Sequence, residues 1–177
     1  GYASNLNLDE YERDLDPLRV QLAECFPTGD ARLDEELGRL FAMITTYSGK
    51  VIDTICDRLT ETSDPVEDLH YLVILARCPM THTVRQRDRI VRSLVELEER
   101  LVARELAQDA SWADRVKEMW VKLALADQFL APAIVAHPKF GRPGHTIFLN
   151  QMPPELLSTA RTAFVRRITA DNEYAWS

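Results

Sequence analysis

The first candidate for chemistry in this chain is His70, which lies in the apolar stretch DPVEDLHYLVILARC. Glu67 and Asp68 precede it closely, and a histidine beside a carboxylate can act as a general base or as a metal ligand. Glu67 and His70 have the Glu-x-x-His spacing of helical di-metal sites, but such a site needs a second copy of the motif on a facing helix. The sequence contains no second copy, so it predicts no metal site. His70 with Glu67 and Asp68 is kept as a candidate for catalysis or small-ligand binding. The alternative is an imidazole that is hydrogen-bonded to a neighbour in the core or at a helix edge.

The second candidate is the stretch over residues 136–152, which is rich in proline and glycine and which we expect to form an ordered loop. Lys139, Arg142 and His145 lie in it and could converge on a phosphate, a carboxylate or a protein partner. Its GRPG motif lacks the Lys-Ser/Thr pair of a P-loop and follows no predicted strand, so it does not support nucleotide binding of that kind.

The same loop contains apolar side chains that are expected to hold it in place. Phe140 and Phe148 should pack against the last two helices, while Lys139 and Arg142 point to solvent. The stretch HTIFLN is the short segment that could adopt an extended conformation.

The other reactive side chains do not form a recognisable site. Cys25, Cys56 and Cys78 are far apart and form neither a CxxC nor a CxxCH motif, which leaves a zinc knuckle, a thioredoxin-like site and a covalent haem unsupported. We expect these cysteines to be buried or half-buried thiols that behave as small hydrophobic side chains. His82 lies in a turn between two threonines, which indicates a solvated or capping residue. Since no Ser-His-Asp or Cys-His arrangement can be assembled from spacing, the sequence predicts no catalytic residue and no cofactor.

The charge balance disfavours two classes of partner. The 177 residues carry a formal net charge of -7, which disfavours non-specific binding to nucleic acid or docking on an anionic membrane. Arg85, Arg87, Arg89 and Arg92 are the best candidate for a local basic patch. Acidic residues lie close to them in sequence, so we interpret this segment as a solvated helix face.

No apolar run approaches the about 20 residues needed to span a bilayer, and no signal peptide is recognised, so the sequence predicts no membrane insertion. We expect the chain to be a single domain excised from a longer protein. Its compartment is therefore left open between the bacterial cytoplasm and export as part of a larger protein.

Helical periodicity recurs along the whole chain, and no stretch has a convincing strand pattern, so the fold class is predicted to be all-α. The helical stretches are residues 14–30, 30–49, 51–59, 61–79, 81–108, 111–130 and 153–170. Helix starts are indicated by N-cap residues, namely Asp16 before Pro17, Asp30, Asp64 before Pro65, Thr83 with Gln86, and Ser111 with Asp114. The expected core contains Leu37, Leu40, Phe41, Leu72, Ile74, Leu94, Trp120 and Phe164.

The breaks between helices are spaced by roughly 35 to 47 residues, which is typical of helix-hairpin repeats. They lie near Gly29, Asp64, Ser111 and Pro153. This spacing favours antiparallel helical hairpins stacked as a short α-solenoid. A compact bundle of six to eight helices is the alternative.

Two segments, residues 25–44 and 64–78, resemble helical units of HEAT-like segments in large multi-domain bacterial proteins. The residues that carry the resemblance are Phe26, Pro27, Gly29, Asp30, Leu33, Glu35, Glu36, Leu37, Leu40 and Phe41, and then Pro65, Glu67, Asp68, His70 and Tyr71. In such proteins these segments accompany propeller-type dehydrogenase-like or c-type cytochrome domains. The resemblance implies a scaffold or docking role. It brings no catalytic residues, and haem binding does not follow from it because the haem motif is absent.

We therefore expect a non-enzymatic helical scaffold or protein-protein interaction domain of a larger bacterial protein. Its partner would be another protein or neighbouring domains of the same chain. The alternative is a helical enzyme, or a small-ligand or anion binder, that uses His70 with Glu67 and Asp68 or the loop residues Lys139, Arg142 and His145.

Overall fold

The computed structural model describes residues 7–107 and 110–170, and all regular structure within these residues is helical. The prediction of an all-α fold is therefore confirmed. In chain order the elements are η1 (Leu8–Tyr11), α1 (Glu12–Cys25), α2 (Ala31–Ile44), α3 (Gly49–Arg58), α4 (Pro65–Leu75), α5 (Val84–Ala103), α6 (Trp112–Ala126), α7 (Leu130–Ala136), η2 (Pro143–Gln151) and α8 (Pro154–Ala170), where η marks a 3-10 helix.

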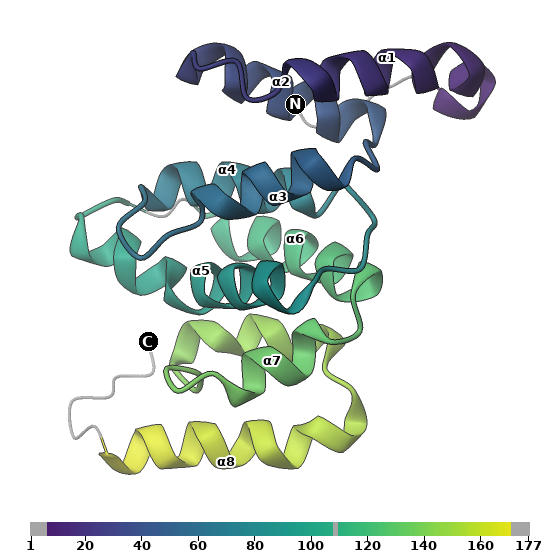
Figure 1. The fold of residues 1–177 in the computed structure, drawn as a ribbon. Coiled ribbons are helices and arrows are strands. Elements are labelled where there is room, and N and C mark those ends of the chain that lie inside the picture. Colours follow the sequence, from purple (N-terminus) through teal and green to yellow (C-terminus); the bar gives the residue numbers. More distant parts are fainter. Residues whose placement is uncertain (1–6, 108–109, 171–177) are drawn as a thin grey trace.

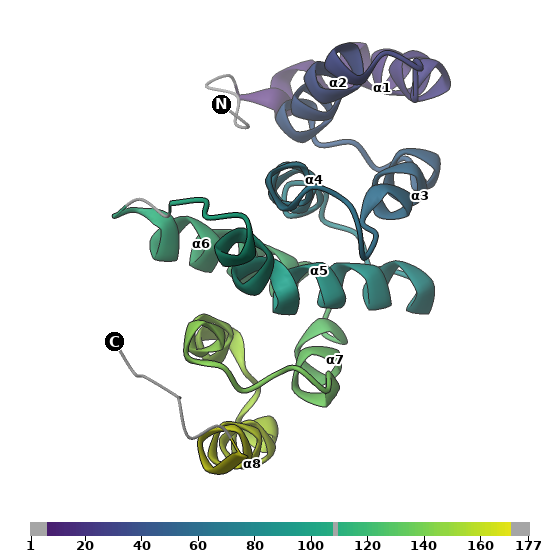
Figure 2. The ribbon, with the colours of Figure 1, turned by 90° about the vertical axis from the view of Figure 1, so that its left-hand side faces the viewer.

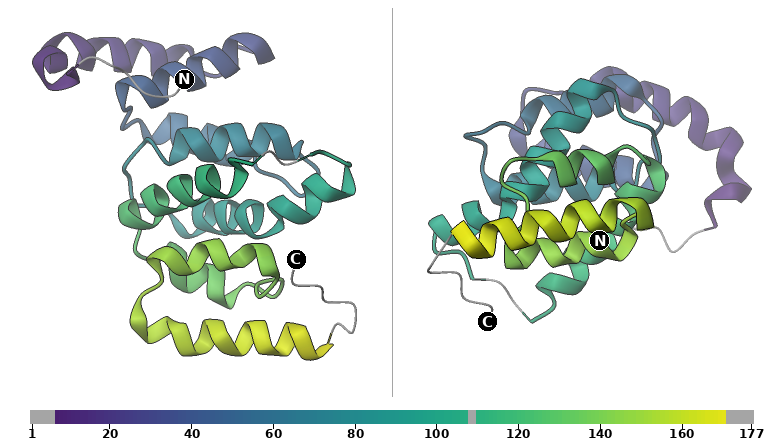
Figure 3. Two further views of the ribbon diagram at one scale, coloured as in Figure 1. Left: turned by 180° about the vertical axis from the view of Figure 1, so that it is seen from behind. Right: turned by 90° about the horizontal axis from the view of Figure 1, so that it is seen from below.

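The helices stack in chain order along one direction (Figure 1). α1 and α2 form the first layer, and α8 lies at the opposite end. The view from behind shows the same succession of layers (Figure 3). Two columns run through the stack, because α2, α4, α6 and η2 pack on one another in turn and α3, α5 and α7 do the same beside them (Figure 2). The face of α2, α4 and α6 carries the candidate site described below.

Several helices begin where the sequence predicts. The Asp30 side chain accepts hydrogen bonds from the backbone N–H groups of residues 32 and 33, and that of Asp64 accepts from residue 66. Thr83 and Gln86 form the reciprocal capping box expected at the start of α5. Ser111 makes no such side-chain bond at the start of α6. These starts depend on residues two or three apart, so local sequence is sufficient to predict most of them.

The first helix begins earlier than predicted. α1 starts at Glu12, and Pro17 lies inside the helix instead of at its first position. The Asp16 carboxylate does not cap the helix but accepts a hydrogen bond from Arg19 at 2.8 Å. Helical spacing predicts one apolar face with Leu18, Leu22 and Cys25. α1 instead buries Arg19 and Ala23, and Leu18 stays 40% exposed. The predicted face is wrong because the long Arg19 side chain reaches the backbone oxygen of Ile44 and is buried by that contact.

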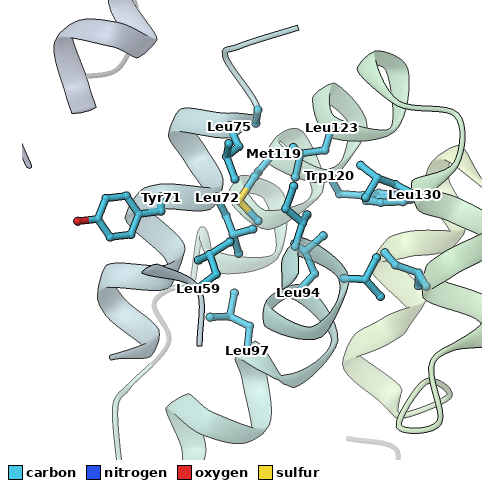
Figure 4. Packing of buried hydrophobic residues seen from close by; sticks show 14 of the residues in the cluster. Leu59, Tyr71, Leu72, Leu75, Leu94, Leu97, Met119, Trp120, Leu123 and Leu130 are labelled. Carbon is cyan, nitrogen blue, oxygen red and sulfur yellow. The ribbon is translucent and has the colours of Figure 1, made fainter. Parts of the chain in front are cut away.

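The buried apolar side chains form one cluster that runs through the stack, and part of it is drawn in Figure 4. Of the eight predicted core residues, six are buried, which are Phe41, Leu72, Ile74, Leu94, Trp120 and Phe164. Leu37 and Leu40 are only half-buried. The apolar pattern therefore identifies most core positions and misses the orientation of α2.

α2 turns a different face to its neighbours because two unexpected residues lie on it. Asp34 is buried, and its carboxylate accepts hydrogen bonds from Thr28 and Arg58. Gly38 lies directly against α4, and a Cβ at this position would come within 2.6 Å of the Ile74 Cδ1 atom. Helical spacing predicts that Leu33 lies on the apolar face of α2, but these contacts turn the helix so that Leu33 is 51% exposed.

Some residues that helical periodicity places on the apolar face of their helix also stay in contact with solvent. They are Val84 and Val102 on α5 and Leu157 and Ile168 on α8. The stretch HTIFLN is not extended, because it forms most of the 3-10 helix η2.

Candidate functional site

A cleft of about 690 Å³ opens on the face formed by α2, α4 and α6. Part of its wall comes from the segment that follows α5, which includes Leu106 and Ala107.

The floor of the cleft is apolar. Its residues come from α4 and α6 at spacings of three and four, so that each helix presents one row. They are Val66, Leu69, Val73 and Ala76 on α4, and Trp112, Val116 and Met119 on α6. Val66 is 54% exposed and Leu106 is 39% exposed, so apolar surface remains open to solvent at the margin.

Charged side chains surround this floor. Glu118 of α6 lies between two cations, 2.6 Å from the Lys122 Nζ atom and 3.7 Å from Arg77 Nη2. The hydrogen bond from Lys122 lowers the pKa of Glu118. On α2, Arg39 forms an ion pair with Glu36, and both Arg39 and Glu35 line the cleft. The site therefore combines an apolar floor with a rim of both signs.

His70 and Glu67 line this cleft together, but Asp68 does not. Asp68 is fully buried on the opposite side of α4, where its Oδ2 atom accepts hydrogen bonds from Arg100 at 2.5 Å and from the Ser93 hydroxyl at 3.2 Å. His70 packs against the ring of Tyr71 with their centroids 5.2 Å apart. Burial lowers its pKa, so the imidazole is neutral at pH 7. The structure thus divides the proposed His70, Glu67 and Asp68 group.

His145, in the predicted loop, is a buried structural residue. Its Nδ1 atom accepts hydrogen bonds from the backbone N–H groups of Gly141 at 3.0 Å and Arg142 at 3.2 Å. The proton therefore lies on Nε2, which is 2.9 Å from the backbone oxygen of Val95. The ring stacks on Phe140, and burial lowers the pKa of His145 to about 4.

The prediction that Lys139 and Arg142 point to solvent is wrong, because both side chains are paired with carboxylates. The Lys139 Nζ atom lies 3.0 Å from a carboxylate oxygen of Glu96, and Arg142 Nη1 lies 3.0 Å from Glu99. α5 presents these two carboxylates to the loop, and their attraction turns both cations toward it. The cations and the His145 ring are therefore engaged with α5 and do not converge on an open anion site.

The aromatic anchors of the loop are confirmed. Phe140 is fully buried against Phe164, and Phe148 packs edge-on against Trp120, with centroids 5.3 Å and 5.2 Å apart. The Trp120 indole N–H also donates to the backbone oxygen of Phe148 at 3.0 Å. Residues 143–151 are a 3-10 helix packed on α6, so the segment is ordered and more regular than a loop.

His82, which the sequence predicts to be a solvated or capping residue, is buried. Its Nδ1 atom lies 3.3 Å from Asp127 Oδ2, which also accepts a hydrogen bond from Arg87 Nε at 3.2 Å. Burial lowers the pKa of His82, although Asp127 opposes this. Arg87 also stacks over Phe129, with 4.9 Å from its guanidinium carbon to the ring centroid. Asp127 is 45 residues from His82, and no local pattern signals their contact.

The arginines of α5 are paired, and Arg85 remains 61% exposed as expected for a solvated face. Arg85 and Arg89 both pair with Asp57, at 2.9 and 2.5 Å. Arg89 and Arg92 also donate to backbone oxygens at the end of α3. Arg85, Arg89 and Arg92 therefore connect α5 to α3 and the residues after it, whereas Arg87 pairs with Asp127.

Two of the cysteines are buried, as expected. Burial raises the pKa of both Cys56 and Cys78 to about 12, so their thiols stay protonated. Cys25 is exposed, contrary to this expectation, because α1 buries Arg19 and Ala23 instead. Across residues 7–107 and 110–170, no cluster of three or more His, Cys, Asp or Glu side chains could hold a metal ion.

Comparison with known proteins gives no match to a family model, a curated protein or a solved structure. In the part of the chain that the structure describes, no single helix is long and apolar enough to cross a membrane. α6 and α7 meet the length and composition criteria only when taken together, and they are bent by 117° at the break between them.

Proposed function

We propose that this domain is a non-enzymatic scaffold that binds a segment of a partner protein in the cleft of α2, α4 and α6. The observation that carries the proposal is the apolar floor, which stays accessible between two charged margins. Exposed apolar surface rimmed by polar residues marks interaction sites. Val66 and Leu106 supply such surface at the edge of the cleft.

The stacking of the layers supports a HEAT-like interpretation as part of the same proposal. Each layer contacts mainly its neighbours, and one column of helices forms a continuous face. Helical-repeat proteins use faces of this kind to bind extended partners. We propose that the domain serves as a docking module within a larger bacterial protein.

The alternative functions find less support in the geometry. An enzyme that uses His70 would need an orienting carboxylate, and Asp68 is directed to Arg100 instead. A small-ligand binder is the second candidate, because the cleft volume of about 690 Å³ lies within the range of roughly 300–1,000 Å³ found for ligand pockets.

Proximity labelling in the native cell extract tests the proposal. The wild-type domain is compared with Val66→Arg and Leu106→Arg, which place a charge at exposed positions of the cleft margin. Leu125→Arg is the matched control, because Leu125 is 73% exposed on α6 and does not line the cleft. We expect the same protein to be labelled by the wild type and the control and to be lost from both cleft variants. Equal labelling by all four proteins would refute the cleft as the binding site.

A further inference from the structure

The charges around the cleft are separated into two groups. Along α6 lie Arg115, Glu118 and Lys122, and Arg77 at the end of α4 joins them through its contact with Glu118. We call these four residues the α6 rim. Their spacing of three and four residues on α6 places them in a row beside the apolar row of that helix. Three cations and one carboxylate make the α6 rim positive.

The opposite margin has the other sign. It consists of Glu35 and Arg39 on α2 with Glu67 and His70 on α4, which we call the α2 rim. A Cβ added at Gly38 would lie 3.4 Å from the His70 Nε2 atom, so these positions of α2 and α4 lie side by side. Two carboxylates, one cation and a neutral imidazole make the α2 rim negative at pH 7.

The apolar row of α4 is long enough to receive one face of a helix. α4 has 11 residues and is therefore about 16 Å long, whereas three apolar anchors at i, i+4 and i+7 span only about 10 Å. Addition of a strand would need an exposed sheet edge, and the described residues contain no strand. A polyproline segment would need a groove lined with aromatic rings, and Trp112 is the aromatic side chain that this cleft offers among the described residues.

We propose that the cleft binds an amphipathic α-helix of a partner protein that carries acidic side chains on one flank and basic side chains on the other. Its apolar face meets the floor, its acidic flank meets the α6 rim, and its basic flank meets the α2 rim. This inference rests on the proposed function and adds the chemistry of the partner. Because turning such a helix end for end would exchange its flanks, the two rims also select its direction.

A display selection with synthetic helical peptides tests this chemistry without a known partner. The library consists of helical peptides of about 18 residues with apolar anchors at i, i+4 and i+7 and with Glu, Lys or Gln allowed on each flank. With the wild-type domain we expect enrichment of Glu on one flank and Lys on the other. A photo-crosslinker at the peptide N-terminus should label one end of the cleft, and exchanging the flank charges should move the label to the other end.

Charge reversal of the α6 rim provides the decisive comparison. With Arg115→Glu and Lys122→Glu combined, we expect enrichment of Lys on both flanks and a loss of about tenfold or more in affinity for the peptide selected by the wild type. The double Gln variant should give an intermediate loss and shows whether folding is retained. Arg161→Glu with Arg166→Glu on α8 is the matched control for net charge, and it should leave both affinity and preference unchanged.

The outcomes separate this inference from the proposed function. Peptides could bind with an affinity that Leu106→Arg lowers but that neither the flank charges nor the α6 rim affects. In that case the proposed partner chemistry is wrong and the cleft remains the binding site. If no helix is enriched, a helical occupant is refuted, and the labelling experiment with Val66→Arg and Leu106→Arg decides the proposed function separately. If the enriched helices bind equally to Leu106→Arg, they do not occupy the cleft and this inference fails.

Discussion

The Nε2–H of His145 donates to the backbone oxygen of Val95 across 2.9 Å and so joins the segment after α7 to the middle of α5. On its other side the same ring accepts two backbone N–H groups of its own turn. Only the neutral imidazole can make all three contacts, because the protonated ring has no acceptor. A residue predicted to bind an anion is thus a neutral connection between two parts of the fold.

Acid should weaken the fold through this residue. The pKa of His145 is about 4 in the folded chain, whereas an unperturbed histidine titrates near 6.5. Between these values the unfolded chain binds a proton that the folded chain does not, so the free energy of unfolding falls as the pH drops from about 6.5 to about 4. The full contribution is present above this window, and its loss is expected to be on the order of 3 kcal/mol.

Urea unfolding at a series of pH values across that window measures the effect. His145→Asn is the control, because its side-chain oxygen can accept the two backbone N–H groups but does not titrate. The variant should be less stable at neutral pH and should lose stability less steeply on acidification. Parallel pH curves for the two proteins would show that His145 is not the titrating group.

Gly141→Ala should be strongly destabilising. Gly141 has φ +113°, and an added Cβ would lie 2.7 Å from the backbone oxygen of Ala163 on α8. Strained backbone and a contact with backbone that cannot move aside should together cost about 2–4 kcal/mol of unfolding free energy in denaturant titration. Gly49→Ala is the matched control, since nothing lies within 4 Å of its added Cβ in α3. A loss as small as that of the control would mean that the turn adjusts freely.

Phe148 and Arg142 should differ in their effect on the segment after α7. Phe148→Ala removes a buried ring from the contact with Trp120 and should cost about 3–5 kcal/mol. Arg142→Ala removes a half-exposed ion pair with Glu99 and should cost less than about 1 kcal/mol. Hydrogen exchange in residues 143–151 should be slow in the wild type and fast only in Phe148→Ala. Fast exchange in the wild type would contradict an anchored segment.

Asp127→Ala should damage the fold more than Asp57→Ala, although each aspartate pairs with arginine. Asp127 is buried against His82 and Arg87, so its removal leaves the Arg87 guanidinium without its buried carboxylate and should cost about 3–5 kcal/mol. Asp57 is half-exposed between Arg85 and Arg89, and its loss should cost about 1 kcal/mol or less. Thermal unfolding of the two variants under one condition makes the comparison, and equal losses would contradict it.

Local sequence was sufficient to predict the fold class, most helix starts and the apolar side of several helices. The capping box of Thr83 and Gln86 joins residues three apart, and Leu72 and Ile74 lie in a stretch that is apolar nearly all round. Such features are determined by backbone hydrogen bonding and helical periodicity over one or two turns. Helix starts and apolar faces can therefore be predicted without knowing which helices pack against each other.

Only the tertiary structure decided which polar groups are buried and which residues share a site. Asp127 reaches His82 across 45 positions, and Lys139 and Arg142 turn toward carboxylates of α5 because the fold brings that helix beside them. Asp68 and His70 are two residues apart but lie on different sides of α4, so the fold divides a pair that sequence proximity suggested. The cleft depends on the same information, because its floor and rims are assembled from three helices and the segment after α5. Charge pairing and burial depend on distance in space, and the one-dimensional pattern does not contain that distance.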